Sequence, residues 1–153
     1  MKAIQVSQFG GPEVLEYVTI PDPEPGPDEV LVDKKAIGVN FRDVTMRANI
    51  FPAALMGRPA PLLPDVPGGE GAGVVAEIGD GVSEVSIGDL VAFYHPEGST
   101  YAEKAVVPSW RLVKLPGGLN AEIGATVILQ GMTAHFLSHT TYQLKAGDVA
   151  LVH

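Results

Sequence analysis

The sequence contains no cysteine among its 153 residues. The lack of thiols excludes a disulfide framework, a Cys-ligated zinc site, an iron–sulfur cluster and a cysteine nucleophile. Long apolar runs are also missing, since none approaches the roughly 18–20 residues that a membrane-spanning helix needs. The first residues carry one lysine but no apolar block behind it, which disfavours a secretory signal peptide. These absences predict a protein of a reducing compartment, most simply cytoplasmic, with no membrane partner.

Positive charge is scarce. The chain has 10 Lys plus Arg against 18 Asp plus Glu, for a formal net charge of −8, and this balance disfavours nucleic acid as a partner. Residues 34–64 nevertheless hold five bases and a single acid, between acidic segments (12–33 and 65–103) that hold no base. Two interpretations remain open for this basic island: a solvated surface, or a patch that faces an anionic ligand such as a cofactor phosphate.

Glycine and proline, by contrast, are abundant, with 18 and 13 residues spread along the chain. So many helix breakers disfavour a helical bundle and predict short strands separated by turns. Asn40 is expected to cap a short helix that runs to about Ala48. Apolar and β-branched segments predict strands over residues 2–7, 14–20, 29–39, 68–79, 88–94, 101–107 and 111–115. Strands at these intervals indicate a mainly β fold, a compact barrel or sandwich.

The composition changes near residue 120. A helix is expected to begin at Asn120 or Ala121, and a second, amphipathic helix to cover residues 130–141. This second helix places Met132, Phe136 and Leu137 at core spacing. Residues 149–152 are all apolar, so residues 149–153 are typical of the start of a strand buried in a parallel sheet. Such a strand needs partners on both edges, so we expect the sequence to be the front part of a longer protein.

Two local patterns invite a functional interpretation and also allow a structural one. The glycine cluster at 68–73 precedes a strand, whereas a dinucleotide-binding loop follows one, so close backbone packing is favoured. Glu70 lies within that cluster, and a carboxylate in an apolar stretch is either buried and paired or functional. His135 and His139 are four residues apart on a predicted helix, but no third ligand accompanies them. No metal site is therefore predicted.

Several motifs, taken together and in order, resemble the quinone oxidoreductase (zeta-crystallin-like) branch of the medium-chain dehydrogenase/reductase superfamily. The resemblance extends over essentially the whole chain. The motifs are FGGPEVLE (9–16), NFRD (40–43), PGGEGAGVVAEIGDGV (67–82), GDLVAFY (88–94), GSTYAE (98–103), LQGMTAHFL (129–137) and KAGDVALVH (145–153).

The resemblance implies a two-part enzyme. Residues 1–120 would form a GroES-like β-barrel catalytic domain. Residues 121–153 would supply connecting helices and the first strand of a truncated Rossmann domain that binds NADPH. The glycine-rich dinucleotide loop of the family would follow residue 153, so the chain alone is expected to be inactive. The full-length protein is expected to be a homodimer.

The resemblance also implies roles for individual residues. Asn40 would lie near the nicotinamide, with Asp43 organising the cleft, and both are catalytic candidates. Thr133 would bind the carboxamide of the cofactor, with Met132 beside it. A structural alternative remains for each of three: Asn40 as a helix cap, Asp43 as a first-turn carboxylate, and Thr133 bonded to its own backbone.

Departures from the zinc alcohol dehydrogenases of the superfamily predict the chemistry. Those enzymes have a cysteine where this chain has Asn40 and a histidine where it has Gly69, so a zinc-independent enzyme is expected. The expected substrate is a quinone or a related conjugated carbonyl. Many relatives carry tyrosine in the cleft where this chain has Thr45 and Phe51, which leaves substrate preference open. Two other functions also remain open: an enoyl reductase of the same superfamily, and a non-catalytic structural or RNA-binding crystallin-like protein.

Overall fold

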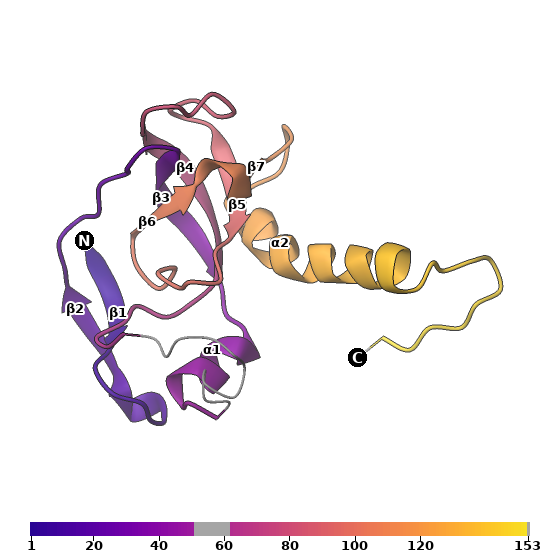
Figure 1. The fold of residues 1–153 in the computed structure, drawn as a ribbon, viewed down its shortest axis with the longest axis horizontal. Helices are drawn as coiled ribbons and strands as arrows, with labels where there is room; N and C mark the ends of the chain where they lie inside the picture. The colour runs from indigo at the N-terminus through magenta and orange to yellow at the C-terminus, as the bar shows by residue number, and fades with distance from the viewer. Residues whose placement is uncertain (51–61, 153) are drawn as a thin grey trace.

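The computed structural model describes residues 1–50 and 62–152. An antiparallel hairpin begins the chain, with strands β1 (Lys2–Val6) and β2 (Leu15–Thr19). The 3-10 turn η1 (Pro12–Val14) connects them. Figure 1 shows this hairpin beside a larger sheet. The backbone N–H groups of Ile4 and Val6 donate to the carbonyls of Tyr101 and Asp65. These bonds join the hairpin to loops that lead into strands of the larger sheet.

The larger sheet has five strands in the order β6-β3-β4-β5-β7, and every neighbouring pair is antiparallel. Its elements are β3 (Glu29–Gly38), β4 (Glu70–Ile78), β5 (Leu90–Tyr94), β6 (Lys104–Pro108), the 3-10 turn η3 (Ser109–Arg111) and β7 (Leu112–Lys114). Each predicted strand of residues 2–115 overlaps an observed one, and the mainly β fold class is confirmed.

The glycines of the 68–73 cluster serve close packing between strands. The β3–β4 register shifts twice, and Gly73 pairs with Lys34 at the second shift. A Cβ added at Gly73 would collide with the backbone of Asp33 and Lys34. Only glycine therefore permits this approach of the two strands, as the packing interpretation of the cluster predicted.

The core lies on both faces of the sheet. One cluster is made mainly of valines and includes Phe93, which is fully buried. A second cluster consists of alanines, Ala72 and Ala92 on the sheet and Ala121 and Ala125 on a helix. Small side chains at this contact let the helix approach closely, so its first turns are held on the sheet (Figure 1).

Two α-helices are formed in the described part of the chain, α1 (Phe41–Arg47) and α2 (Ala121–His135). Asn120 caps α2 as predicted, and its Oδ1 accepts from the N–H of Ile123 at 2.9 Å. The prediction of a separate helix beginning at residue 130 is wrong, because α2 continues through that point into the π-helical turn η4 (Phe136–Thr141). Gly131 is tolerated within the helix.

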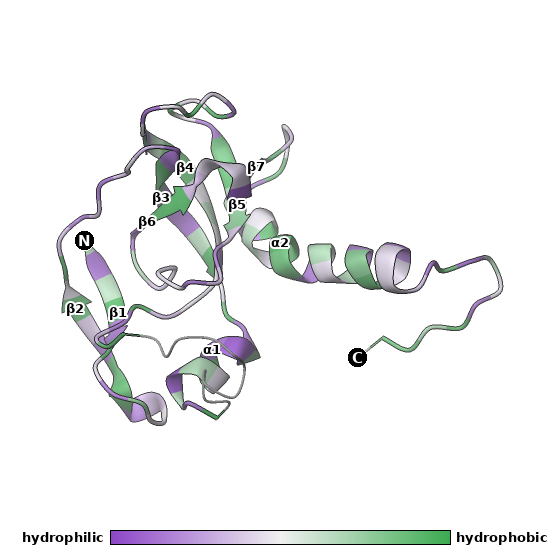
Figure 2. Ribbon diagram, viewed as in Figure 1, coloured by the Kyte–Doolittle hydropathy of each residue, from purple (hydrophilic) through white to green (hydrophobic). Residues whose placement is uncertain are grey.

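The second half of α2 and the residues after it are exposed. Met132, Phe136 and Leu137 are 46%, 56% and 54% exposed, so the prediction that they belong to the core is wrong. Residues 149–152 form no strand, although a buried one was predicted over 149–153. The reason is physical: α2 packs on the sheet through its first turns and its middle, and its end extends beyond the sheet (Figure 1). In the described part of the chain, no strand lies beside residues 149–152. Figure 2 shows the apolar residues of this segment away from the sheet. Within residues 1–50 and 62–152, no helix is long and apolar enough to cross a membrane.

Candidate active site

The start of α1 holds two of the predicted site residues. Asn40 occupies the N-cap position, and its carbonyl oxygen accepts from the N–H of Asp43 at 2.9 Å. The Oδ2 atom of Asp43 in turn accepts from the N–H of Asn40 at 2.9 Å. This reciprocal pair satisfies backbone groups that a helix start leaves open. The expected capping position of Asn40 is confirmed, but the amide of its side chain bonds elsewhere.

Asp43 is 5% exposed and holds a neighbour in place. Its Oδ2 also accepts from the phenol of Tyr101 at 2.9 Å, and its Oδ1 lies 4.0 Å from the guanidinium of Arg42. Burial, together with the hydrogen bond and the negative charge of Asp43, raises the pKa of Tyr101 well above its usual range. The phenol is thus a permanent donor, and the carboxylate joins α1 to the segment before β6.

Glu70, at the first residue of β4, lies at the centre of a second network. Its side chain is 1% exposed. The Oε1 atom accepts from Asn40 Nδ2 at 2.7 Å and from Gln130 Nε2 at 3.3 Å. The Oε2 atom accepts from the backbone N–H of Leu129 at 3.1 Å. Both networks therefore meet at Asn40, and they connect α1, β4 and α2.

Thr133 extends this site along α2. Gln130 Nε2 also donates to Asn40 Oδ1 at 2.9 Å, which brings the start of α1 against the middle of α2. Thr133 lies three residues after Gln130 and therefore on the same side of the helix. Its hydroxyl donates to the carbonyl of Leu129 at 2.8 Å, which leaves the oxygen lone pairs free to accept.

Met132 faces a different space, a pocket of about 290 Å³ between α2 and the sheet. Ile128 lines it from the same helix, and Tyr94 and Trp110 line it from β5 and η3. The guanidinium of Arg111 stacks on Trp110, 4.6 Å from the ring centre. This volume approaches the roughly 300 Å³ at which small-molecule sites begin.

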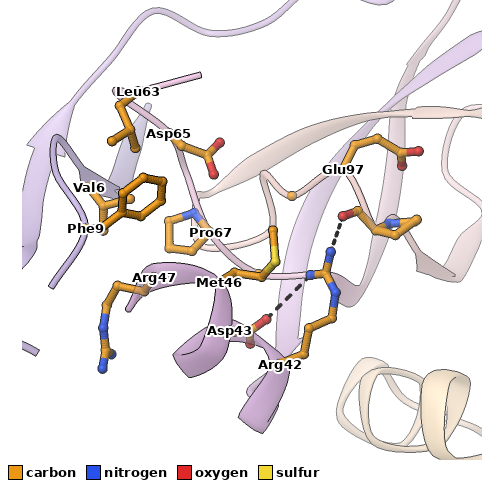
Figure 3. Close-up of a pocket in the computed structure, with 13 residues that line it drawn as sticks. Val6, Phe9, Arg42, Asp43, Met46, Arg47, Leu63, Asp65, Pro67 and Glu97 are labelled. Carbon is orange, nitrogen blue, oxygen red and sulfur yellow. Dashed lines mark hydrogen bonds and ion pairs between the residues drawn. The ribbon is translucent and has the colours of Figure 1, made fainter. Parts of the chain in front are cut away.

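Another pocket lies beside α1 and is shown in Figure 3. Arg42, Asp43 and Met46 of α1 line it, together with Phe9. Its volume of about 50 Å³ suffices for one or two water molecules and is too small for a quinone. Arg42 fixes its wall, because the guanidinium donates to the carbonyl of Pro96 and lies near Asp43 (Figure 3).

Three of the four described bases of the basic island donate to backbone carbonyls in different places. Lys34 Nζ donates to two backbone carbonyls, Arg42 donates to Pro96, and Arg47 Nε donates to the carbonyl of Gly10 at 3.2 Å. Lys35 is exposed. Arg58 lies outside the described residues, as does Phe51. Thr45, the other departure in the predicted cleft, donates its hydroxyl to the carbonyl of Arg42 at 2.7 Å.

The two helix histidines lie side by side, as their spacing implied. The rings of His135 and His139 are stacked, with centroids 4.2 Å apart, where α2 passes into η4, and both residues are exposed. Among residues 1–50 and 62–152, no three His, Cys, Asp or Glu side chains come close enough to hold a metal ion.

The sequence did not identify Tyr101 and Gln130 as partners of the site residues. Tyr101 meets Asp43 across 58 positions of sequence, and Gln130 meets Asn40 across 90. No local spacing encodes such pairs. The one available indication was Glu70, whose position in an apolar stretch required polar partners from elsewhere.

Comparisons with known proteins agree with this fold. The alcohol dehydrogenase GroES-like domain profile matches residues 26–117. A quinone oxidoreductase of Pseudomonas aeruginosa is 41% identical over 99% of this chain and 45% of its own length. A 2-haloacrylate reductase of a Burkholderia species is 35% identical, again over 99% of this chain and 45% of its own length. The chain thus spans about 45% of the length of these relatives.

Solved structures agree. A quinone oxidoreductase of Pseudomonas syringae pv. tomato superimposes with a TM-score of 0.87 at 44% identity, over 96% of this chain and 43% of that one. The Escherichia coli quinone oxidoreductase complexed with NADPH gives a TM-score of 0.86 at 32% identity, over 95% of this chain and 42% of that one. The chain therefore belongs to the alcohol dehydrogenase GroES-like domain family, and its relatives include quinone oxidoreductases of the medium-chain dehydrogenase/reductase superfamily.

Proposed function

We propose that this chain is the N-terminal catalytic part of a zinc-independent, NADPH-dependent oxidoreductase that reduces quinones or related conjugated carbonyls. The observation that carries the proposal is the meeting of Asn40, Glu70 and Gln130 inside a domain of this family. It brings the first turn of α1 and the middle of α2, the two elements on which the cofactor residues were expected, into direct contact. The relatives' names and the NADPH complex supply the reaction class.

The donor set at this contact fits the nicotinamide end of such a cofactor. Asn40 is half-buried and uses one N–H and one lone pair within the protein, which leaves the other N–H and lone pair for a ligand. Thr133 offers a hydroxyl oxygen three residues beyond Gln130. Neutral amide and hydroxyl groups complement an uncharged carboxamide, whereas they would hold a metal ion poorly.

In this proposal the chain's residues bind, orient and exclude water. When bound, the nicotinamide supplies the reducing electrons. Asn40 holds the nicotinamide end and Thr133 its carboxamide. Asp43 acts as a positioning residue rather than as a proton donor, because its Oδ2 is engaged by Asn40 N–H and Tyr101. Alignment of this kind contributes to rate by pre-organising the reactants.

Zinc independence is part of the proposal. Asn40 and Gly69 occupy the positions at which zinc-dependent members of the superfamily have cysteine and histidine ligands. Glu70, the remaining candidate ligand, has both carboxylate oxygens engaged by N–H donors. A catalytic zinc needs three protein ligands, and this position offers no set of three.

A second candidate reaction is reduction of a conjugated carbon–carbon double bond, as in the enoyl reductase alternative. The Burkholderia relative, a 2-haloacrylate reductase by name, favours it.

We further propose that the full-length protein is a cytoplasmic homodimer. A nucleic-acid partner is disfavoured by the net charge of −8, together with the use of Arg42 and Arg47 inside the protein.

The test is a chimera that joins residues 1–153 to the remaining part of the Pseudomonas aeruginosa relative. We expect this protein to oxidise NADPH with a quinone acceptor and the 153-residue chain alone to give no turnover. The reason is that the dinucleotide loop would lie beyond residue 153. Thr133→Ala in the chimera should raise the KM for NADPH about 2- to 10-fold, the loss of one hydrogen bond. Robust turnover by the chain alone, or an inactive chimera that is folded and binds NADPH, would contradict the proposal.

A further inference from the structure

We propose that Glu70 and Gln130 are positioning residues that fix which way the carboxamide of Asn40 points. The inference rests on the proposed function, because the orientation matters for catalysis only if Asn40 contacts the nicotinamide. It goes beyond that function by assigning to two further side chains a role that they exert through Asn40. The geometry of the contacts carries it.

An ionised carboxylate can only accept hydrogen bonds. Asn40 must therefore turn its NH₂ group toward Glu70 Oε1, which lies 2.7 Å away. The carbonyl oxygen of the same amide then faces the opposite way, where Gln130 Nε2 donates to it at 2.9 Å. Rotating the amide by 180° would place an N–H against Gln130 Nε2 and an oxygen against the carboxylate. Both contacts would be repulsive, so one orientation of Asn40 is strongly favoured.

Gln130 is oriented by the same carboxylate. Its Nε2 donates to Glu70 Oε1 at 3.3 Å as well as to Asn40, so the amide of Gln130 is also held in one orientation. The three side chains form a closed triangle of donors and acceptors. Glu70 therefore determines the orientation of both side-chain amides in the network.

Burial makes the arrangement stiff. Glu70 is 1% exposed, and among the described residues no Lys, Arg or His forms an ion pair with it. The three N–H donors are what offsets the cost of burying its charge, so losing any of them is expensive. Gly38 makes room for the carboxylate, because a Cβ at that position would collide with the Glu70 side chain.

The same carboxylate sets the distance between two helices. Its Oε2 accepts from the backbone N–H of Leu129 on α2, while its Oε1 holds Asn40 at the start of α1. Glu70 thus fixes both the direction of the Asn40 amide and the separation of Asn40 from the Thr133 side of α2. A catalytic geometry assembled from these two helices would depend on it.

The first experiment needs only the 153-residue chain. The side-chain NH₂ resonances of Asn40 are followed by NMR in the wild type, Glu70→Gln and Gln130→Ala. In E70Q one carboxylate oxygen becomes an NH₂ group. Both oxygens of Glu70 accept from N–H groups, so this NH₂ group faces a donor in either orientation. The Asn40 side-chain signals should therefore shift, and its two amide protons should exchange faster with solvent. In Q130A, which removes an exposed side chain and should leave the fold intact, the signals should also shift.

The two control variants make the same kinds of chemical change at exposed positions outside the Glu70 network. Glu77→Gln makes the same change at an exposed position of the same strand, and Gln143→Ala removes an exposed glutamine after α2. Neither should move the Asn40 resonances. If the Asn40 amide signals are unchanged in both E70Q and Q130A, the proposal is wrong.

The second experiment uses the chimera and separates positioning from folding. Q130A should lower kcat about tenfold or more while the KM for the quinone stays within about twofold, since misalignment costs rate rather than binding. An unchanged kcat in Q130A would also overturn the proposal. An inactive wild-type chimera would instead contradict the proposed function, and the NMR result would then decide the Asn40 orientation independently.

Discussion

At the residue scale, the half-buried position of Lys34 changes the pKa of its amine. The residue lies on β3, and its Nζ donates to the carbonyls of Ser99 and Lys104 at 2.8 and 2.9 Å. Burial lowers its pKa to about 7 from an ordinary value near 10.5. Below pH 7 the folded and unfolded chains both carry the proton, so the penalty of burying the charge is present in full. Between about pH 7 and 10.5 the folded chain releases the proton first, which favours folding as the pH rises.

We therefore expect Lys34→Met to be more stable than the wild type at pH 6, and we expect this advantage to become smaller between pH 7 and pH 9. The urea midpoint measured at several pH values checks this, as the difference between the two proteins, so that other titrating groups cancel. Lys35→Met removes a neighbouring, exposed lysine and should show no such pH-dependent difference. A constant difference between K34M and the wild type from pH 6 to 9 would contradict the assignment.

At the scale of elements, the close packing of α2 on the sheet depends on a glycine. Gly124 is buried where the helix crosses the sheet, and a Cβ there would lie 2.7 Å from Leu115 Cδ1 and 3.2 Å from the Cβ atoms of Ala72 and Ala92. Alanine is the better helix former by about 1 kcal/mol. The close contact with two rigid alanines costs more, since overpacking costs about 1–3 kcal/mol.

We accordingly expect Gly124→Ala to lower the free energy of unfolding and Gly131→Ala to raise it by about 0.5–1 kcal/mol. Gly131 belongs to the same helix, and the nearest atom to an added Cβ there is Val127 Cγ1 at 3.4 Å. Urea denaturation of the two variants gives the comparison. If both changes stabilise the chain equally, the helix is not packed on the sheet as closely as the structure has it.

Elements were predictable where local chemistry decides them. The strands between residues 2 and 115 follow from β-branched segments between turns, and both helix starts follow from asparagine caps. The continuation of α2 past residue 130 was not predictable, because the amphipathic spacing over residues 130–141 favours a separate helix. Exposure of Met132, Phe136 and Leu137 was missed for another reason. Periodicity shows which face of a helix is apolar, but it does not show whether anything covers that face.

The local position of two site candidates was predictable, but the contacts between distant segments were not. Asn40 and Asp43 follow from a local motif, whereas the Asp43–Tyr101 and Asn40–Gln130 contacts join segments that only the sheet topology brings together. For the whole molecule, this division also explains the basic island. Its bases are neighbours in sequence, but in the fold Lys34, Arg42 and Arg47 donate to carbonyls in three different places.

At the scale of the whole molecule, the sequence and the structure give two independent reasons to expect a protein without bound zinc. The chain has no cysteine. Its remaining candidate near the site, Glu70, is buried with both oxygens accepting hydrogen bonds, so binding a cation there would require breaking the network that holds Asn40. The stacked pair His135 and His139 offers two ligands on an exposed helix, which is too few for tight binding.

The last prediction is that the purified chain, given one equivalent of zinc and then dialysed, contains far less than one zinc per chain by elemental analysis. A His135→Ala/His139→Ala variant serves as the control, because residual zinc that disappears with it comes from the exposed helix. Zinc that remains stoichiometric in this variant and disappears in Glu70→Gln would place a metal at the Asn40 site. Zinc-free NADPH turnover by the chimera would then be the decisive measurement, because a metal-dependent reductase would lose activity on chelation while the proposed one would keep it.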